Sequence, residues 1–320
     1  MRTRSHALLH VAPLSWWFRS RLSNDQIDGV IVPAHFRTFD ASSTAFGANT
    51  FNPTPRTADA PSTPRLIEVW SERRTFPGSQ GHPLAARLDW RSTPIRQCAV
   101  IVHCFTCGKD LRAANIISRT LAARGVAVLR FDLTGIGESE GDFAATNFSS
   151  SVADVVSAVD YADREIGPTK LLIGHSLGGT AAILAASQLP QLAGLATIGA
   201  PFRADHIRGL IAEDVATIAR DGSATVSIAG RPFTITGQFL SDLALAEDSG
   251  AVGRLGRPLL ILHAPADDIV DIDNAHRIFE AASHPKSLIA LDGADHLLTR
   301  RDDALFAAEM IATWATRLVV

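Results

Sequence analysis

From residue 98 onward, short apolar runs alternate with longer amphipathic stretches, and this alternation restricts the fold more than any other feature of the sequence. Nearly continuous apolar runs are typical of strands that are buried on both faces, as in a parallel sheet. Strand–helix alternation predicts βαβ units, and hence an α/β fold whose mostly parallel central sheet is flanked by helices. The predicted strands are residues 98–104, 126–131, 170–174, 192–198, 258–263 and 287–291, and the predicted helices are residues 111–124, 151–165, 177–189, 274–283 and 304–318.

The predicted domain spans residues 66–320 and begins with an edge hairpin, residues 66–70 and 84–90. The stretch before it differs in composition. Its first 24 residues carry four Arg and no acid, but polar residues and a proline break the apolar part, so the pattern does not favour a signal peptide. Residues 36–65 are rich in Thr, Ser, Ala, Asn and Pro and have too little apolar surface to offset the entropy cost of ordering. We expect residues 1–65 to form a flexible N-terminal extension.

One connection is far longer than the others, because about 55 residues separate the sixth and seventh core strands. An insertion of this length in a compact domain is usually functional. We therefore expect a cap at about residues 202–255, over the carboxyl edge of the sheet, with a helix at 204–219 and a hairpin at 224–235 that turns at Gly230-Arg231. Three aromatic residues of this region predict an apolar pocket beneath the cap: Phe202, Phe233 and Phe239.

Composition gives no support for several classes of partner and location. The net charge of −3 gives no reason to expect nucleic acid or an anionic membrane as a partner. No run of about 18 apolar residues occurs, so no transmembrane helix is expected. The three cysteines are an odd number, which argues against a secreted disulfide scaffold and favours the cytoplasm. Nothing in the sequence indicates the oligomeric state.

The segment Gly174-His-Ser-Leu-Gly178 carries the strongest chemical signal. It matches the pattern G-x-S-x-G, and it lies directly between a predicted strand and a predicted helix, as a nucleophile elbow requires. Small residues two positions before and after the serine allow the strand and helix to approach each other closely. We interpret Ser176 as a nucleophile; the competing interpretation is an ordinary glycine-rich turn.

A serine hydroxyl is a weak nucleophile and needs a base, and this fold orders the chain as serine, acid, histidine. Asp267 and Asp268 follow one late strand, and His296 follows the next. In the pattern "HGxxD" of this fold the acid is the fourth residue after the histidine. Asp267 is the fourth residue after His263, so we prefer it to Asp268. His296 is the predicted general base; otherwise it is a surface loop histidine.

The developing oxyanion also needs preorganised donors. One is expected to be the backbone N–H of Leu177, directly after the nucleophile, and the other lies in the loop His103-Cys-Phe-Thr-Cys107. By position Phe105 supplies this second N–H, with Cys104 as the alternative. Cys104 and Cys107 form a C-x-x-C pair, which could be a redox or metal motif, but no second pair exists to complete a zinc site. We expect the pair to pack beside the active site.

Several longer segments resemble α/β hydrolases of the serine aminopeptidase-like and lipase-like group. More closely, residues 72–320 resemble the hydrolase half of bacterial proteins that fuse such a domain to an OsmC-like peroxide-reducing domain. The resemblance implies the hydrolase fold and the triad of Ser176, Asp267 and His296, but no natural substrate. The segments that carry it are "HCFTCGKD" (103–110), "VLRFDLTGIGESEGDF" (128–143), "TNFSS" (146–150), "LLIGHSLGG" (171–179), "ATIGAP" (196–201), "AGRPF" (229–233) and "ADHLL" (294–298).

These features together predict a serine hydrolase that cleaves an ester, thioester or amide bond of a small acyl substrate, with an ester most expected. No cofactor and no metal are implied. Two alternatives stay open. One is a redox or peroxide-response protein that uses Cys104 and Cys107. The other is a hydrolase fold that serves as a non-catalytic interaction module.

Overall fold

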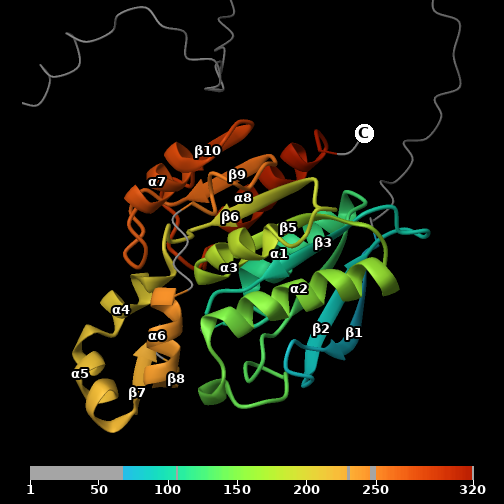
Figure 1. Cartoon of the computed structure of the whole chain (residues 1–320). Coiled ribbons are helices and arrows are strands. Elements are labelled where there is room, and N and C mark those ends of the chain that lie inside the picture. Colours follow the sequence, from blue (N-terminus) through green and yellow to red (C-terminus); the bar gives the residue numbers. More distant parts are fainter. Residues whose placement is uncertain (1–67, 106, 229–230, 246–249, 319–320) are drawn as a thin grey trace, which may run out of the picture. The chain divides into compact units, whose positions relative to one another are not determined.

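The computed structural model describes residues 68–105, 107–228, 231–245 and 250–318, so the predicted extension at residues 1–65 lies outside the described residues. The predicted α/β fold is confirmed (Figure 1), with eight strands in one sheet in the order β1-β2-β4-β3-β5-β6-β9-β10. β2 pairs antiparallel with β1 and β4, and the other neighbours are parallel. The strands are β1 (Trp70–Pro77), β2 (Pro83–Trp90), β3 (Cys98–Val102), β4 (Ala127–Phe131), β5 (Thr169–His175), β6 (Gly194–Ile198), β9 (Leu259–His263) and β10 (Lys286–Ala290).

Helices cover both faces of this sheet, and the strand side chains alternate between two apolar layers. On β3, Cys98, Val100 and Val102 enter the layer under α2, α3 and α7. Ala99 and Ile101 enter the other layer, under α1 and α8. All five residues are buried, which explains why the sequence of such a strand lacks polar alternation. The helices are α1 (Arg112–Ala123), α2 (Phe148–Glu165), α3 (Leu177–Ala186), α7 (Asp273–Ala281) and α8 (Arg301–Ala315), with the short 3-10 helix η2 (Phe143–Ala145) before α2.

Of the boundaries that differ from the prediction, two have a clear local reason. The first strand of the edge hairpin lies at Trp70–Pro77 rather than residues 66–70, because the chain turns at Gly78–Gly81, where Gly81 has a φ of 82° and donates its N–H to the carbonyl of Gly78. α2 begins at Phe148 rather than residue 151, since Asn147 and Ser150 form a capping box.

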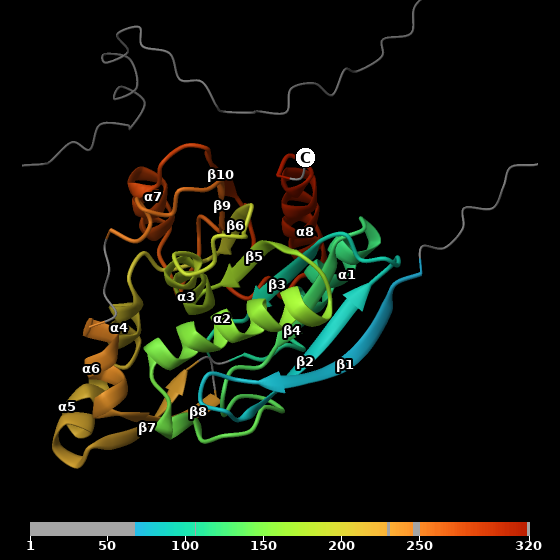
Figure 2. The ribbon, with the colours of Figure 1, turned by 45° about the vertical axis from the view of Figure 1, so that its right-hand side comes forward.

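The insertion lies between β6 and β9, the sixth and seventh strands of the main sheet, as predicted, and its elements gather at the lower left of Figures 1 and 2. The region predicted as one helix, residues 204–219, is helical but is divided into three pieces, because Gly209 lowers helix propensity and Ile211 interrupts the helix with a φ of −120°. The predicted hairpin is confirmed, although residues 229–230 of its predicted turn region lie outside the described residues. The elements are η3 (Ala204–His206), α4 (Ile207–Leu210), α5 (Ala212–Asp221), β7 (Ser223–Ile228), β8 (Arg231–Thr236) and α6 (Gly237–Leu245).

Candidate active site

Ser176 lies in the sharp turn between β5 and α3, with a φ of 55° and a ψ of −131°. This conformation is rare for a residue with a side chain and stores backbone strain. Close approach of the flanking backbone explains the neighbouring glycines. A Cβ on Gly174 would lie 2.4 Å from the Cα of Gly179, and one on Gly178 would lie 2.3 Å from the carbonyl oxygen of His103. The turn therefore presents Ser176 at the carboxyl end of β5.

Three side chains predicted from the sequence meet at this point. The Nε2 atom of His296 lies 2.9 Å from the Oγ atom of Ser176, and the Nδ1 atom of His296 lies 2.8 Å from Oδ2 of Asp267. An ionised carboxylate only accepts hydrogen bonds, so Nδ1–H donates to Asp267 and Nε2 accepts from the serine hydroxyl. The arrangement allows His296 to remove the serine proton.

Asp267, and not its neighbour Asp268, contacts His296. Its Oδ1 atom accepts hydrogen bonds from the backbone N–H groups of Ile269 and Val270, each at 2.9 Å. Burial alone would raise the pKa of Asp267, but the hydrogen bonds from His296 and these N–H groups outweigh burial and lower the pKa. The carboxylate is therefore ionised at neutral pH. Asp268 is exposed and lines the adjoining pocket.

Gly199, the first residue after β6, also belongs to the site and was missed as a site residue in the sequence analysis. Its φ is 53°, and a Cβ there would lie 3.2 Å from Nδ1 of His296 and 3.3 Å from Oδ2 of Asp267. A side chain at this position would press on the hydrogen bond between the two residues. The signal was its position directly after an apolar strand, within the segment "ATIGAP".

Two buried histidines hold the loops that carry His296 and Asp267. The Nε2 atom of His175 lies 2.8 Å from the carbonyl oxygen of His296. The Nε2 atom of His263 lies 2.7 Å from the carbonyl oxygen of Val270, whose N–H binds Asp267. A carbonyl oxygen only accepts, so both Nε2 atoms carry a hydrogen. Each histidine is the last residue of an apolar strand, and this position was the signal that could have identified them.

A third buried histidine, His103, holds the loop that carries Phe105. Its Nε2 atom accepts the backbone N–H of Leu133 at 3.2 Å, so its Nδ1 atom carries the hydrogen and donates to the carbonyl oxygen of Cys104 at 2.6 Å. In a planar trans peptide, this C=O and the following N–H point in opposite directions. The hydrogen bond to Cys104 therefore also sets the direction of the Phe105 N–H. Phe105 and Leu177, the predicted oxyanion residues, line the same pocket as Ser176.

Burial of His175 predicts a loss of stability in mild acid. In the unfolded chain this histidine takes up a proton near pH 6.5, whereas burial lowers its pKa to about 4 in the folded protein. Between these values the unfolded state binds more protons, so the free energy of unfolding falls as the pH falls. From pH 6.5 to 5 we expect His175 alone to lower it by about 2 kcal/mol.

Urea unfolding of the wild type and of His175→Gln at both pH values measures this loss. Burial lowers the pKa of His103 and His263 in the same sense, but these residues are present in both proteins and cancel in the comparison. The variant should lose about 2 kcal/mol less than the wild type. Equal losses would show that His175 does not carry the effect.

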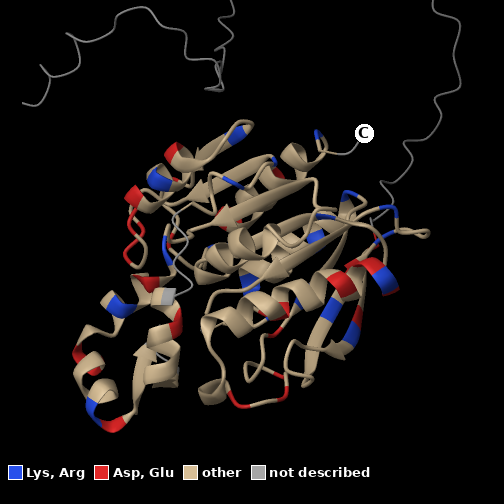
Figure 3. Ribbon diagram, in the orientation of Figure 1, with Lys and Arg blue, Asp and Glu red and all other residues tan. Residues whose placement is uncertain are grey.

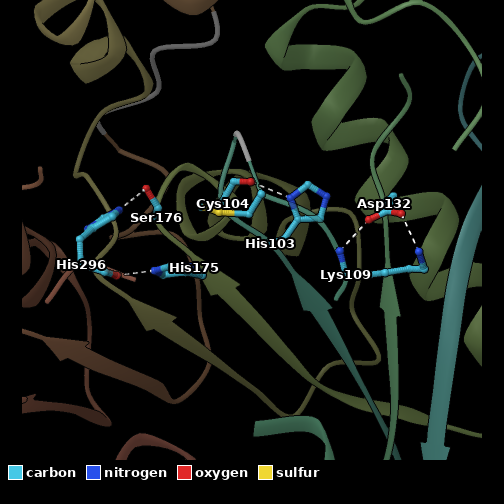
Figure 4. Close-up of a disulfide and its surroundings, with 8 residues drawn as sticks. His103, Cys104, Lys109, Asp132, His175, Ser176 and His296 are labelled. Atoms are coloured by element: carbon cyan, nitrogen blue, oxygen red, sulfur yellow. Dashed lines mark hydrogen bonds and ion pairs between the residues drawn. A yellow bond between two sulfur atoms is a disulfide. The ribbon is translucent and has the colours of Figure 1, made fainter. Parts of the chain in front are cut away.

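Cys104 and Cys107 are joined by a disulfide, with their Cα atoms 5.3 Å apart. The prediction placed the pair beside the active site, and Cys104 does line the pocket with Ser176. The prediction did not include the covalent bond between the two cysteines. In Figure 4, Cys104 lies between His103 on one side and Ser176 on the other. The N–H of Cys107 also donates to the carbonyl of Cys104 at 3.0 Å, so a turn closes the same loop as the disulfide.

Next to this loop lies a charge cluster in which Lys109 and Asp132 are buried and Glu138 is exposed. The Nζ atom of Lys109 lies 2.9 Å from Oδ2 of Asp132 and 2.6 Å from Oε2 of Glu138. Asp132 also accepts the backbone N–H groups of Lys109 and Glu138, at 2.6 and 3.0 Å. The cluster therefore ties the loop after β3 to the loop after β4.

Elsewhere, charged residues of both signs are interspersed over the helices, the insertion and the strands β1 and β2 (Figure 3).

A pocket of about 480 Å³ lies beside Ser176, a volume within the range of pockets that bind small molecules. The insertion supplies part of its wall. His206 of the insertion lies with Nε2 2.8 Å from the carbonyl oxygen of Ile269, which joins the insertion to the loop of Asp267. The lining residues are mostly apolar: Cys104, Phe105, Ser176, Leu177, Pro201, His206, Ile207, Leu210, Ser227, Asp268, Ile269, Val270, Asp295, His296, Leu297 and Thr299.

The aromatic residues predicted to line this pocket do not line it. Phe239 is buried and packs on Phe105 with ring centroids 5.1 Å apart, and Phe233 packs on Phe143 at 5.4 Å. Phe202 also lies outside the lining. The pocket is apolar as predicted, but other residues line it. Phe233 and Phe239 bury their large rings against other aromatic rings, Phe202 packs against the guanidinium of Arg277, and the aliphatic residues Ile207 and Leu210 of the insertion face the cavity.

Among the residues that the structure describes, no helix is long enough and apolar enough to cross a bilayer. Within that same part of the chain, no three His, Cys, Asp or Glu side chains converge in a way that could hold a metal ion.

Comparison with known proteins shows which family the chain is similar to. The family described as "Serine aminopeptidase, S33" matches residues 94–229. Human monoglyceride lipase is 28% identical over 238 residues, which cover 65% of this chain and 78% of the lipase. A Salmonella typhimurium protein that is named YfhR and called uncharacterized is 27% identical over 207 residues, and the chain spans 66% of that relative's length.

Solved structures agree with these relatives. The esterase domain of a Rhodothermus marinus protein is 42% identical, with a TM-score of 0.63, and the match covers 78% of this chain and 98% of that domain. A putative hydrolase from Agrobacterium vitis S4 is 20% identical, covers 79% of this chain and 100% of its own, and has a TM-score of 0.64, which shows the shared fold alone. The chain belongs to the α/β-hydrolase family, among its esterase- and lipase-like members.

Proposed function

We propose that the protein is a serine hydrolase that cleaves esters of small acyl groups through Ser176, His296 and Asp267. The observation that carries the proposal is the continuous hydrogen-bonded chain from the carboxylate through the imidazole to the hydroxyl, at 2.8 and 2.9 Å. Its serine end lines a pocket of about 480 Å³, which gives a substrate carbonyl room beside the nucleophile. A base held by a third group beside a strained serine is the arrangement that nucleophilic catalysis requires.

The proposed reaction has two matching halves. The Oγ atom of Ser176 attacks the ester carbonyl carbon while Nε2 of His296 takes its proton, and the N–H groups of Phe105 and Leu177 stabilise the oxyanion. His296 then gives the proton to the leaving alcohol, and the acyl group stays on the serine. Water attacks this acyl-enzyme while His296 takes its proton, and His296 then returns that proton to the Oγ atom of Ser176 as the acid leaves. Asp267 stabilises the imidazolium in both halves.

An uncharged ester is the proposed substrate class, in preference to a thioester or amide. Two relatives support it: one is named a monoglyceride lipase and the other an esterase domain. The mostly apolar lining suits an acyl chain, and the volume suits a substrate of small-molecule size. We propose the cytoplasm as its setting, on composition alone, because three cysteines in 320 residues are typical of a protein from a reducing compartment.

A fluorescent fluorophosphonate tests the proposal, because it reacts only with an activated serine. We expect the wild type to be labelled and Ser176→Ala to remain unlabelled. Ser187→Ala is the matched control: this serine ends α3 at an exposed position, and its loss should leave labelling unchanged. A panel of p-nitrophenyl esters of increasing acyl length then measures the size of the pocket. If the folded wild type stayed unlabelled and turned over no ester, a non-catalytic hydrolase-fold module would be the better interpretation.

A further inference from the structure

The disulfide between Cys104 and Cys107 lies in the loop that carries one proposed oxyanion donor. Phe105, the residue after Cys104, supplies that donor, so the covalent link closes around the peptide that has to point at the substrate. Both cysteines are nearly buried, with 4% and 7% of their surface exposed. Cys104 nevertheless lines the pocket beside Ser176, so one of the two linked residues borders a space that small molecules can enter.

Three constraints converge on one peptide group. The carbonyl of Cys104 accepts Nδ1–H of His103 at 2.6 Å and the N–H of Cys107 at 3.0 Å. The disulfide holds Cys107 against Cys104, and so it maintains the second of these hydrogen bonds. Because the peptide is planar, fixing its carbonyl fixes its N–H, which belongs to Phe105. Opening the disulfide removes the covalent constraint and leaves only the hydrogen bonds.

We propose that the Cys104–Cys107 disulfide is a redox control of the proposed esterase site, with the oxidised form the more active. This inference rests on the proposed function. The oxidised loop holds the Phe105 N–H ready for the oxyanion, and reduction lets this peptide reorient. Disulfides are rare in cytoplasmic proteins, and those that occur are usually transient and either catalytic or redox-sensing, so a redox-sensing pair is compatible with the proposed setting.

Reduction takes two electrons from a thiol reductant. A thiolate attacks one sulfur of the pair, forms a mixed disulfide and releases the other cysteine as a thiolate, which takes a proton. A second thiolate attacks the mixed disulfide, so that two cysteine thiols and one disulfide of the reductant result. The remaining cysteine does not take part, because burial raises the pKa of the Cys98 thiol to about 12.

The experiment compares turnover of one enzyme in both redox states. The protein is reduced with dithiothreitol, freed from it by gel filtration under nitrogen and assayed with a p-nitrophenyl ester, so that the reagent cannot cleave the ester itself. Alkylation of the denatured protein and mass measurement should count one free thiol in the oxidised form and three in the reduced form. We expect kcat to fall about tenfold or more on reduction, with KM within about twofold, because loss of an oxyanion donor acts on the transition state.

Controls separate this effect from unfolding. Oxidised glutathione, which accepts the two electrons, should restore kcat. Cys98→Ala should respond like the wild type, and a variant with both Cys104→Ser and Cys107→Ser should be as slow as the reduced enzyme and indifferent to redox state. Urea unfolding of both states should show that each is folded under assay conditions.

The outcomes divide cleanly between the two proposals. If kcat is unchanged or higher after complete reduction, or if the double variant keeps full activity, the redox control is wrong and the esterase proposal stands. If the oxidised enzyme neither hydrolyses esters nor reacts with a fluorophosphonate, both proposals fail together.

Discussion

Replacing Asp267 with asparagine is expected to lower kcat for ester hydrolysis by about 10⁴-fold. The carboxylate accepts Nδ1–H of His296 at 2.8 Å and so leaves Nε2 free to accept the proton of Ser176. An asparagine can present its NH₂ group to Nδ1, which favours the tautomer with the hydrogen on Nε2. That tautomer cannot act as the base. Because the substitution removes no heavy atom from the contact, KM should change little. Steady-state kinetics with a p-nitrophenyl ester measures both constants.

Asp268→Asn is the matched control for this substitution. Asp268 is the next residue in the chain, but it is exposed and lines the pocket. Unlike Asp267, it does not contact His296. We expect its kcat to remain within about threefold of the wild type, since an exposed charge interacts weakly with its surroundings. A larger loss from Asp268→Asn than from Asp267→Asn would reverse the assignment of the acid.

Replacing Lys109 with methionine is expected to lower the free energy of unfolding by about 3–5 kcal/mol. The Lys109 and Asp132 side chains are only 2% and 1% exposed, and their charges lie 2.9 Å apart. Methionine fills similar space but leaves the Asp132 carboxylate buried without its cation. Removing one partner of a buried ion pair is costly because water cannot solvate the charge that is left. Urea unfolding at pH 7 measures the change.

Two further variants make this result specific. Arg124 and Glu309 form an exposed pair, 52% and 41% exposed, so Arg124→Met should cost at most about 1 kcal/mol. A double variant with Lys109→Met and Asp132→Leu should recover part of the loss and not all of it. Asp132 also accepts the N–H groups of Lys109 and Glu138, and leucine leaves both without that acceptor. A cost for Lys109→Met no larger than that of Arg124→Met would show that the buried pair contributes little.

The middle of the central sheet was predictable because its inner strands, β3 to β6 and β9, are almost wholly buried on both faces. A strand such as β3 has no polar alternation, and a short, continuous apolar run that is bounded by loops indicates a buried strand. The insertion was less predictable. The helix α6 was missed, although Thr236 accepts the N–H of Phe239 as a cap would. Its first residue is a glycine, which lowers helix propensity, so packing rather than local preference stabilises it.

The active site, like the fold, was predictable only in part. The spacing of Ser176, Asp267 and His296 relative to the strands brought these residues to the proper edge of the sheet, because parallel strands end there together. The bond between Cys104 and Cys107 was not predicted, because the C-x-x-C spacing by itself does not distinguish packing, redox and metal roles. Phe202 was misplaced because a sequence does not show which face of an insertion meets the sheet.

The buried histidines His103, His175 and His263 also make the protein its own spectroscopic reporter. Each has one ring N–H that is shielded from water and bound to a carbonyl in a different loop: that of Cys104, His296 or Val270. Shielded, hydrogen-bonded N–H groups exchange slowly with solvent. Their proton resonances are therefore observable in water without an attached label. Each resonance follows one loop, so movement in the oxyanion loop can be distinguished from movement in the loops of the base and the acid.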